Sequence, residues 1–350
     1  MEPLRVGVIG SGYWGPNLAR NFAELPNSRL VAVADLDEAR LASMQSRHPG
    51  IYVTKRYQDL FACNLDAVVV ATPPATHYAI VQDCLRHNLH VLVEKPLTLS
   101  SQHAEELILL AENRGLTLMV GHTFEYNSAV HKLKELIDSG ELGQIYYIDM
   151  VRVNLGLFQR GLNVLWDLAP HDISILFYLL GPTSLSVNAH GTCCIFKDLH
   201  DVVYLNLELA NNILAHIRVS WIDPSKTRRV TVVGSKKMVV YDDLELSEKI
   251  KVYDKGVEPP PYTDNFGEFQ CTYRHGEVVI PPLQFVEPLK QECQHFLDCI
   301  RNHWTPRSDG RAGLNVVRVL EAAQASLMSG GQRQDLRFEP VEMLQLAVGS

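Results

Sequence analysis

Short apolar runs alternate with amphipathic stretches along the first 125 residues of the chain. The stretches repeat their apolar positions every three to four residues, as helices do, whereas the runs are rich in Val and Ala and end near Gly or Pro. The predicted strands are Arg5–Gly10, Leu30–Ala34, Ala67–Ala71, Val91–Val93 and Leu116–Gly121, and the helices include Asn17–Leu25, Tyr78–His87 and Gln102–Arg114. This alternation predicts an α/β Rossmann-type domain, residues 1–125, whose doubly wound parallel sheet is covered on both faces.

The alternation of apolar runs and helical stretches ends near Tyr126, where we expect a second domain, residues 126–350, to begin. Helices are predicted at Ser128–Ser139 and Ile173–Leu180, and strands at Ile145–Asn154, Ser184–Phe196, Val202–Leu209, Asn212–Trp221, Arg228–Gly234 and Lys237–Tyr241. Consecutive strands joined by tight turns predict an α+β domain with an open, mainly antiparallel sheet. The polar, proline-rich stretch Asp254–Pro282 is predicted to be loop, and helices at about 288–302 and 313–329 close the domain.

Composition and charge narrow the function classes. The chain has 350 residues, of which 46% are hydrophobic and 21% charged, and its formal net charge is −8. This charge argues against a nucleic-acid or membrane partner, because both need clustered Lys and Arg. The N-terminal apolar stretch is too short for a signal peptide, and seven cysteines without Cys-x-x-Cys spacing favour reduced thiols and no metal. We therefore expect a cytoplasmic protein.

A glycine motif follows the first predicted strand. The stretch "GSGYWG" has the form G-x-G-x-x-G, with Gly10, Gly12 and Gly15 at the fixed positions and Tyr13 and Trp14 between them. The first glycine permits a tight turn, the second lets the backbone approach a pyrophosphate, and the third lets helix and strand pack closely. The helix that follows supplies amide donors for phosphates. The motif therefore predicts a dinucleotide site.

Asp35 ends the second predicted strand, 20 residues after Gly15, where the ribose diol of a dinucleotide is expected. A carboxylate at this point favours NAD over NADP, because a 2′-phosphate would meet like charge. Arg40 follows on the next helix; it could reach round to this site, but it is expected to be exposed. The alternative interpretation is a glycine turn with an unrelated surface aspartate.

The fourth and fifth segments add polar residues at strand ends. The run Thr72-Pro73-Pro74 stops one strand sharply and forms a rigid wall where ligands bind in open α/β sheets. His77 begins the next helix, either in contact with the cofactor or as an exposed residue of the first turn.

Glu94, Lys95 and Pro96 follow the next buried run. Charges are costly inside a parallel sheet but natural at its ligand-binding edge. A lysine there could bind a substrate hydroxyl and the nicotinamide ribose, and could stabilise a developing alkoxide. For Glu94 we expect only a supporting role, beside Lys95 or a backbone amide.

The segment "WDLAPHDI" is the second catalytic candidate. Asp167 and His171 are four residues apart, so they share a face if one helix includes both. Since Pro170 is tolerated only near a helix start, Asp167 could instead be the N-cap. A histidine in the first turn of a helix stays neutral and can accept a proton, which makes His171 the candidate acid–base residue.

Taken together, these motifs resemble the Gfo/Idh/MocA sugar and cyclitol dehydrogenases over nearly the whole chain. The resemblance implies NAD(P)-dependent chemistry on a secondary alcohol and a homodimer or homotetramer formed through the C-terminal sheet. It also implies that Lys95 contacts substrate and nicotinamide ribose, that a cis bond precedes Pro96, that Asp167 belongs to the substrate site and that His171 moves the proton.

Further residues are candidate substrate contacts. Trp166 is part of a bulky Leu-Trp pair where the family often has two glycines, and it could pack on a sugar face. Asn127 could bind substrate or cap the helix that follows. Arg152, Asn154 and Arg160 precede Trp166 and would suit an anionic substrate, although as surface residues they need no explanation.

Within the family, the sequence of these motifs is most similar to that of members that oxidise UDP-N-acetylglucosaminuronate at C3. A nucleotide sugar is therefore the expected substrate, and inositol-type cyclitols or free aldoses are the alternative. A second alternative is an NAD-binding regulator without turnover, which would not need both Lys95 and His171.

Overall fold

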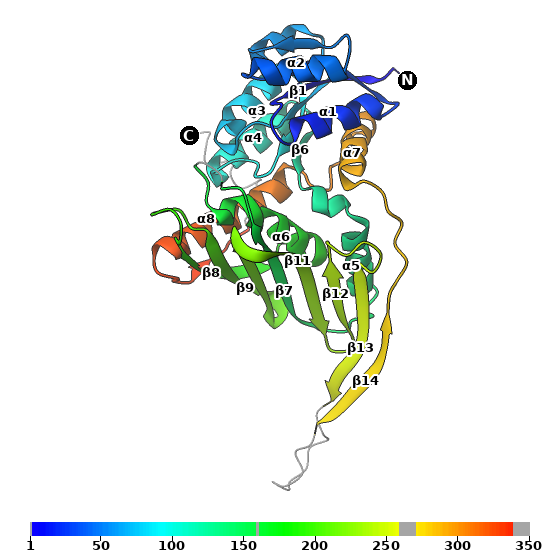
Figure 1. Cartoon of the computed structure of the whole chain (residues 1–350), viewed down its shortest axis with the longest axis vertical. Coiled ribbons are helices and arrows are strands. Elements are labelled where there is room, and N and C mark those ends of the chain that lie inside the picture. Colours follow the sequence, from blue (N-terminus) through cyan, green and yellow to red (C-terminus); the bar gives the residue numbers. More distant parts are fainter. Residues whose placement is uncertain (1, 159–160, 259–270, 339–350) are drawn as a thin grey trace. The chain divides into compact units, whose positions relative to one another are not determined.

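The computed structural model describes residues 2–158, 161–258 and 271–338, and Figure 1 shows the course of the chain. The described residues form two compact units. The first contains residues up to 126 together with 286–318, and the second contains 127–285 together with 319–338. The predicted boundary after residue 125 is therefore close, but the chain returns to the first unit near its end.

The first unit is built on a parallel sheet of six strands in the order β3-β2-β1-β4-β5-β6. The strands are β1 (Leu4–Ile9), β2 (Ser28–Ala34), β3 (Tyr52–Thr54), β4 (Ala67–Val70), β5 (His90–Glu94) and β6 (Leu118–Gly121). This order is that of a Rossmann fold, which confirms the predicted class. It places the carboxyl ends of β1 and β4 at the switch point, where such folds bind ligands. The short β3 was not predicted.

Helices and 3-10 turns connect these strands. They are α1 (Gly15–Glu24), α2 (Glu38–Arg47), η1 (Tyr57–Ala62), η2 (Pro74–Thr76), α3 (His77–Arg86), α4 (Ser101–Asn113) and η3 (Thr123–Tyr126). The strands are buried almost completely: Val6, Val69 and Leu92, on three neighbouring strands, are at most 1% exposed. This burial on both faces explains why the sequence shows apolar runs rather than alternation.

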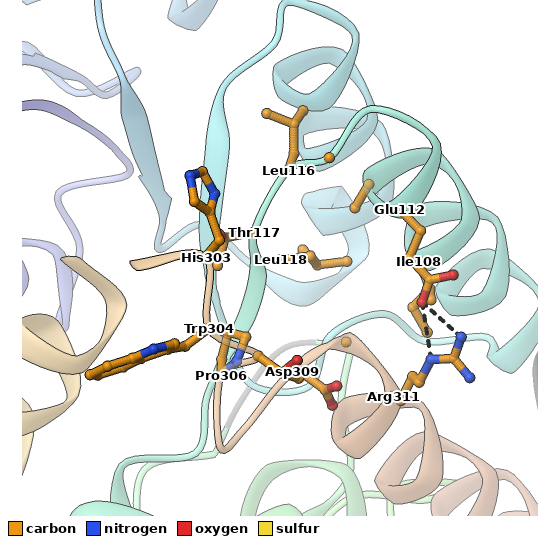
Figure 2. A pocket seen from close by; sticks show the side chains of 14 residues that line it. Ile108, Glu112, Leu116, Thr117, Leu118, His303, Trp304, Pro306, Asp309 and Arg311 are labelled. Carbon is orange, nitrogen blue, oxygen red and sulfur yellow. Dashed lines mark hydrogen bonds and ion pairs between the residues drawn. The ribbon is translucent and has the colours of Figure 1, made fainter. Parts of the chain in front are cut away.

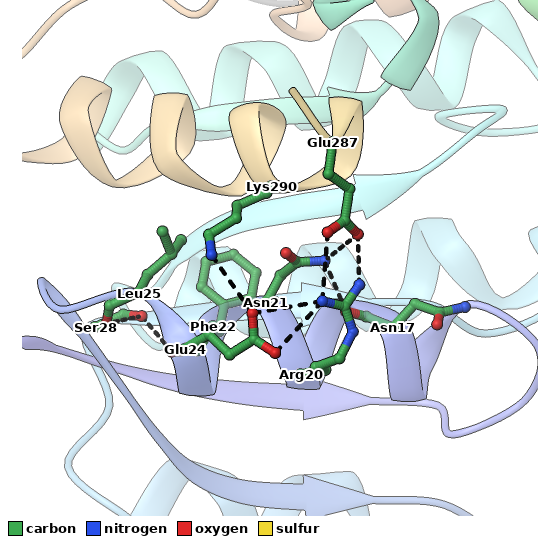
Figure 3. A network of polar contacts seen from close by, with 9 residues as sticks. All are labelled: Asn17, Arg20, Asn21, Phe22, Glu24, Leu25, Ser28, Glu287 and Lys290. Carbon is green, nitrogen blue, oxygen red and sulfur yellow. Dashed lines mark hydrogen bonds and ion pairs between the residues drawn. The ribbon is translucent and has the colours of Figure 1, made fainter. Parts of the chain in front are cut away.

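Helix α7 (Pro288–Asn302) also belongs to the first unit, although the sequence suggested the second. Phe296 of α7 packs edge-to-face on Phe22 of α1, and neither ring is exposed. Glu287, at the start of α7, accepts from Arg20 and Asn21 of α1 (Figure 3). Because Arg20 and Glu287 are each about 40% exposed, this ion pair contributes at most about 1 kcal/mol. Burial of the rings, about 1.5–3 kcal/mol each, holds α7 in place.

The second unit is built on a nine-stranded sheet in the order β14-β13-β12-β11-β7-β10-β9-β8-β15. Neighbouring strands are antiparallel except β7 and β10, which run parallel, so the sheet is mixed and mainly antiparallel as predicted. The strands are β7 (Ile145–Leu155), β8 (Ser184–Thr192), β9 (Val202–Leu209), β10 (Ile213–Ser220), β11 (Ile222–Gly234), β12 (Met238–Asp242), β13 (Ile250–Glu258), β14 (Thr272–Val279) and β15 (Gln334–Asp335).

Two predictions for this unit need correction. The stretch Asp254–Pro282 was expected to be loop, but β13 and β14 occupy much of it and pair with each other. Most of β14 is exposed, so it lacks the buried alternation by which a strand is recognised in a sequence. The helix expected at Ile173–Leu180 begins earlier, as α6 (Val164–Leu180).

One face of the second sheet packs against helices. Helix α6 contacts β7, β9 and β10, and α5 (Ser128–Asp138) contacts β12. The remaining elements are η4 (Ala210–Asn212) and α8 (Gly310–Met328). On β9 and β10, Leu205 and Ile217 are fully buried, whereas Tyr204 and Leu214, at alternate positions of the same strands, are 41% and 57% exposed. Within the described ranges, no helix combines the length and hydrophobicity that a membrane crossing requires.

Candidate functional site

The loop between β1 and α1 carries the three motif glycines, each in a different environment. A Cβ at Gly10, whose φ is +95°, would lie 2.5 Å from the Ala71 carbonyl oxygen, and one at Gly15 would overlap the Gly10 carbonyl oxygen. A Cβ at Gly12 would have only an Arg40 nitrogen nearby, at 3.7 Å. Gly10 and Gly15 are therefore required by the fold, and Gly12 leaves the loop surface open for a ligand.

Asp35 lies just after β2 and fixes this loop. Its Oδ2 accepts from the Ser11 amide at 2.5 Å and its Oδ1 from the Asp37 amide at 2.8 Å. Arg40 of α2 reaches back to the same carboxylate, with Nη1 3.9 Å from Oδ2, while its side chain stays 53% exposed. The predicted ribose corner thus holds one carboxylate and one guanidinium; Arg40 is exposed as expected and also reaches round, which was the alternative.

His77 connects two loops at this edge. Its ring is fully buried, with Nδ1 2.9 Å from the Pro96 carbonyl oxygen and Nε2 2.8 Å from that of Thr72. Burial lowers the pKa of His77, so the ring is neutral near pH 7 and donates to one of the two carbonyls. His77 is therefore not an exposed first-turn residue. Its ring lies between the Thr72-Pro73-Pro74 wall and the turn at Pro96.

Glu94 and Lys95 end β5 at the same edge, and the Lys95–Pro96 bond is cis. Glu94 lies against Gly121 of β6 and accepts from the Lys95 amide at 3.3 Å. Burial raises the pKa of Glu94 to about 7, although the charge of Lys95 opposes the shift. Burial, helped by the same charge, lowers the pKa of His122 to about 3. Lys95 thus lies near a carboxyl and an imidazole whose neutral forms are favoured by burial.

Two further buried acids lie behind these residues, and sequence reasoning missed both. Glu292 of α7 is completely buried and accepts from Thr123 Oγ1 at 2.9 Å. Burial raises its pKa well above the usual range, and the charges of Glu94 and Glu125 add to the effect. Burial likewise raises the pKa of Glu125. Nothing in the helical pattern of α7 distinguishes Glu292, because only the fold brings it to η3.

Helix α6 carries the second set of candidates. Its N-cap is Asn163, whose side chain accepts from the Trp166 amide at 3.2 Å, so the alternative that Asp167 is the N-cap is wrong. Asp167 and His171 both lie inside the helix, four residues apart, on one face. Asp167 Oδ2 accepts from the indole Nε1 of Trp221 at 3.0 Å. Trp221 was not predicted as a site residue, since it lies between β10 and β11, 54 residues away in the sequence.

Arg152 of β7 does not project toward solvent. Its guanidinium forms two hydrogen bonds with Asp172 of α6, at 2.9 and 3.0 Å, and the two residues are 5% and 1% exposed. The structure therefore corrects the interpretation of Arg152 as a surface cation. It is half of a buried ion pair between sheet and helix.

The remaining candidates are placed as follows. Asn127 Oδ1 accepts from the Ala129 amide at 2.8 Å, so this residue caps α5, as the alternative proposed. Trp166 is only 8% exposed, and Asn154 lies on β7 and is partly buried. Arg160 lies outside the described residues. Among the residues described, no group of three or more His, Cys, Asp or Glu side chains is arranged to hold a metal ion.

A separate pocket of about 340 Å³ lies elsewhere on the first unit (Figure 2). It is lined by the end of α4, the start of β6 and the segment 303–311, and an ion pair of Glu112 and Arg311 lies on one side. Because it adjoins the amino end of β6, it is not part of the site at the carboxyl ends of the strands.

The glycines allow a direct test of the loop. Gly15→Ala is expected to destabilise the protein by several kcal/mol, because its Cβ has no room beside Gly10 and overpacking alone costs about 1–3 kcal/mol. The matched variant Gly12→Ala should unfold at the wild-type urea midpoint but bind dinucleotide more weakly by tenfold or more. Titration calorimetry measures the binding, and wild-type affinity in Gly12→Ala would contradict the assignment of the loop.

Comparison with known proteins places this geometry in a family. Residues 4–122 match the Gfo/Idh/MocA oxidoreductase family with its NAD-binding Rossmann fold, and residues 130–240 match the Gfo/Idh/MocA C-terminal domain. The chain is 27% identical to UDP-N-acetylglucosamine 3-dehydrogenase of Acidithiobacillus ferrooxidans, over 92% of this chain and 96% of the relative. It is also 27% identical to scyllo-inositol 2-dehydrogenase (NAD(+)) of Bacillus subtilis, over 87% and 88%.

Solved structures agree with this placement. The GnnA structure of the Acidithiobacillus ferrooxidans enzyme superposes with a TM-score of 0.79 at 25% identity, covering 95% of this chain and 100% of that one. GenD2 from gentamicin A biosynthesis, solved in complex with NAD, gives 0.81 at 26% identity, covering 96% and 97%. With both of its domains matched, the chain belongs to the Gfo/Idh/MocA family of oxidoreductases.

Proposed function

We propose that this chain is an NAD-dependent dehydrogenase that acts on a secondary hydroxyl of a sugar. The observation that carries the proposal is Lys95, a cation at the carboxyl end of β5, beside the loops that the glycine motif and His77 shape. The residues fit a dinucleotide, because Gly12 leaves the loop open and Asp35 stands at the ribose corner. Bound NAD would supply the hydride acceptor.

The side chains then divide the remaining chemistry. His171 takes the proton from the substrate hydroxyl, and Asp167, one helical turn earlier, binds the substrate. Lys95 donates to the same oxygen and stabilises the negative charge that develops on it. Glu94 supports Lys95 by holding its backbone amide.

The substrate is proposed to be a nucleotide sugar such as UDP-N-acetylglucosaminuronate, oxidised at C3. The relative named UDP-N-acetylglucosamine 3-dehydrogenase, which matches over nearly its whole length, supports this choice. The scyllo-inositol dehydrogenase matches at the same identity, so a cyclitol is the alternative substrate. A panel of UDP-sugars, inositols and aldoses, followed at the NADH absorbance, separates the two.

Lys95→Met and His171→Asn test the catalytic roles. Each is expected to lower kcat by roughly 10²–10⁴-fold, since a general base or an oxyanion donor contributes on this scale. NAD affinity, measured by fluorescence titration, should change little. Lys134→Met and His275→Asn make the same changes at surface positions and should keep wild-type turnover.

A regulator without turnover would behave differently. No NADH from any substrate of the panel, together with unchanged NAD affinity in Lys95→Met and His171→Asn, would exclude the enzyme interpretation.

Cofactor preference depends on Asp35 and Arg40. A 2′-phosphate beside the Asp35 carboxylate would cost about 1–4 kcal/mol at 4 Å, so NAD should be preferred in kcat/KM by roughly tenfold or more. Asp35→Ser should raise kcat/KM with NADP, because Arg40 then faces the 2′-phosphate without the carboxylate. In Asp35→Ser/Arg40→Ala this increase in kcat/KM with NADP should disappear. A wild-type enzyme that uses NADP better than NAD would refute the role of Asp35.

We also propose that a second copy of this chain covers the open face of the C-terminal sheet. Tyr147 of β7 pairs in register with Leu214 of β10, and both side chains are about half exposed. Burying such a patch is favourable, and patches of this kind mark interaction sites.

Leu214→Arg should therefore lower the mass measured by sedimentation velocity to that of a smaller assembly. Leu246→Arg, at a loop residue that is 87% exposed, should leave the mass unchanged. A monomeric wild-type protein would rule out the proposed interface.

A further inference from the structure

Helix α6 is interrupted between its two candidate site residues. Pro170 lies inside the helix, between Asp167 and His171. Because proline has no amide hydrogen, the bond from residue 170 to the Trp166 carbonyl is missing, and its ring crowds that carbonyl. The hydrogen bonds of the helix alone therefore hold the Asp167 turn and the His171 turn together less firmly than in an unbroken helix.

A contact from the sheet holds the turn before the proline. Trp221, which is 1% exposed, donates its indole hydrogen to Asp167 at 3.0 Å. Its backbone is bonded on both sides, since its amide donates to Asp201 and its carbonyl accepts from Gly156, each at 2.9 Å. Phe158 packs on the indole with ring centroids 5.1 Å apart. The donor is thus fixed in position and direction.

A second contact holds the turn after the proline. Asp172 follows His171 directly and binds the Arg152 guanidinium through both of its oxygens. Such a bidentate pair fixes orientation as well as distance. Arg152 lies opposite Val219 in the parallel pair of β7 and β10, and Val219 is two residues before Trp221. Both contacts therefore come from neighbouring positions of one sheet.

We propose that Trp221 and Arg152 are positioning residues that set the spacing of Asp167 and His171 across the break at Pro170. The sheet, rather than the helix, then determines the geometry of the pair. This inference rests on the proposed function only for its kinetic consequences, because the contacts themselves can be tested without a substrate.

Trp221→Phe tests the first contact. Phenylalanine keeps a ring against Phe158 but has no N–H, so kcat should fall roughly tenfold to hundredfold, the loss expected for one hydrogen bond to a charged group. KM, NAD affinity and the melting temperature should stay close to wild type. The control is Trp304→Phe, the same change at a tryptophan that is 58% exposed. A wild-type kcat in Trp221→Phe would overturn the role of Trp221.

A spectroscopic test needs no activity. In protein labelled with ¹⁵N-tryptophan, the Trp221 indole signal is identified by its loss in Trp221→Phe. It should shift in Asp167→Asn, whereas the Trp304 signal should not. An unmoved Trp221 signal would overturn the contact. If the contact is present but the wild-type enzyme turns over no substrate of the panel, the proposed function fails and the positioning geometry stands.

The ion pair is tested by replacing both partners. Removing Arg152 alone would leave a buried carboxylate unpaired and could unfold the protein, whereas a well-packed apolar pair of similar volume is often neutral for stability. Arg152→Met/Asp172→Leu should therefore melt near the wild-type temperature. Its kcat should nevertheless fall tenfold or more, because the two hydrogen bonds that orient the turn after Pro170 are gone. Wild-type kcat in this stable double variant would show a purely structural role and overturn the proposal for Arg152.

Discussion

The burial of a parallel sheet on both faces is the constraint on which the first unit depends. Its strands have no polar face, so an ionised group is tolerated only where a strand ends. This places Asp35 after β2, Thr72 after β4 and Lys95 after β5, at the same edge of the sheet. The glycine loop after β1 opens onto that edge with the amides at the start of α1. The position of the candidate cofactor site thus follows from the cost of burying charge.

The loops at this edge need additional support, because their backbone groups no longer belong to the strand ladders. His77 supplies it through a hydrogen bond to one of the two carbonyls that face its ring, those of Thr72 and Pro96, and Glu94 supplies it through the Lys95 amide. His77 is fully buried and Glu94 partly so, and desolvation favours the neutral form of each.

The sequence could predict those parts of the fold that have a local signal. The strands from β1 to β6, apart from the three-residue β3, show as apolar runs, and the glycine motif and Asp35 show by spacing. The start of α6 was missed because Pro170 indicates a helix beginning, although tertiary contacts carry the helix through it. Arg152 with Asp172, and Trp221 with Asp167, join residues 20 and 54 positions apart. The pattern of apolar and polar residues does not indicate such pairs, because the partners come together only when the sheet forms.

In both units, the candidate catalytic side chains are positioned by contacts from neighbouring elements. A side chain that is to do chemistry must keep its polar end accessible, so its own element can fix it only from one side. In the first unit, a buried histidine on α3 and a carboxyl on β5 fix the backbone around Lys95. In the second, the indole and the guanidinium, both from the sheet, fix α6 on either side of Pro170. The supports in the first unit bind backbone groups, whereas in the second unit the indole and the guanidinium bind the side chains of Asp167 and Asp172.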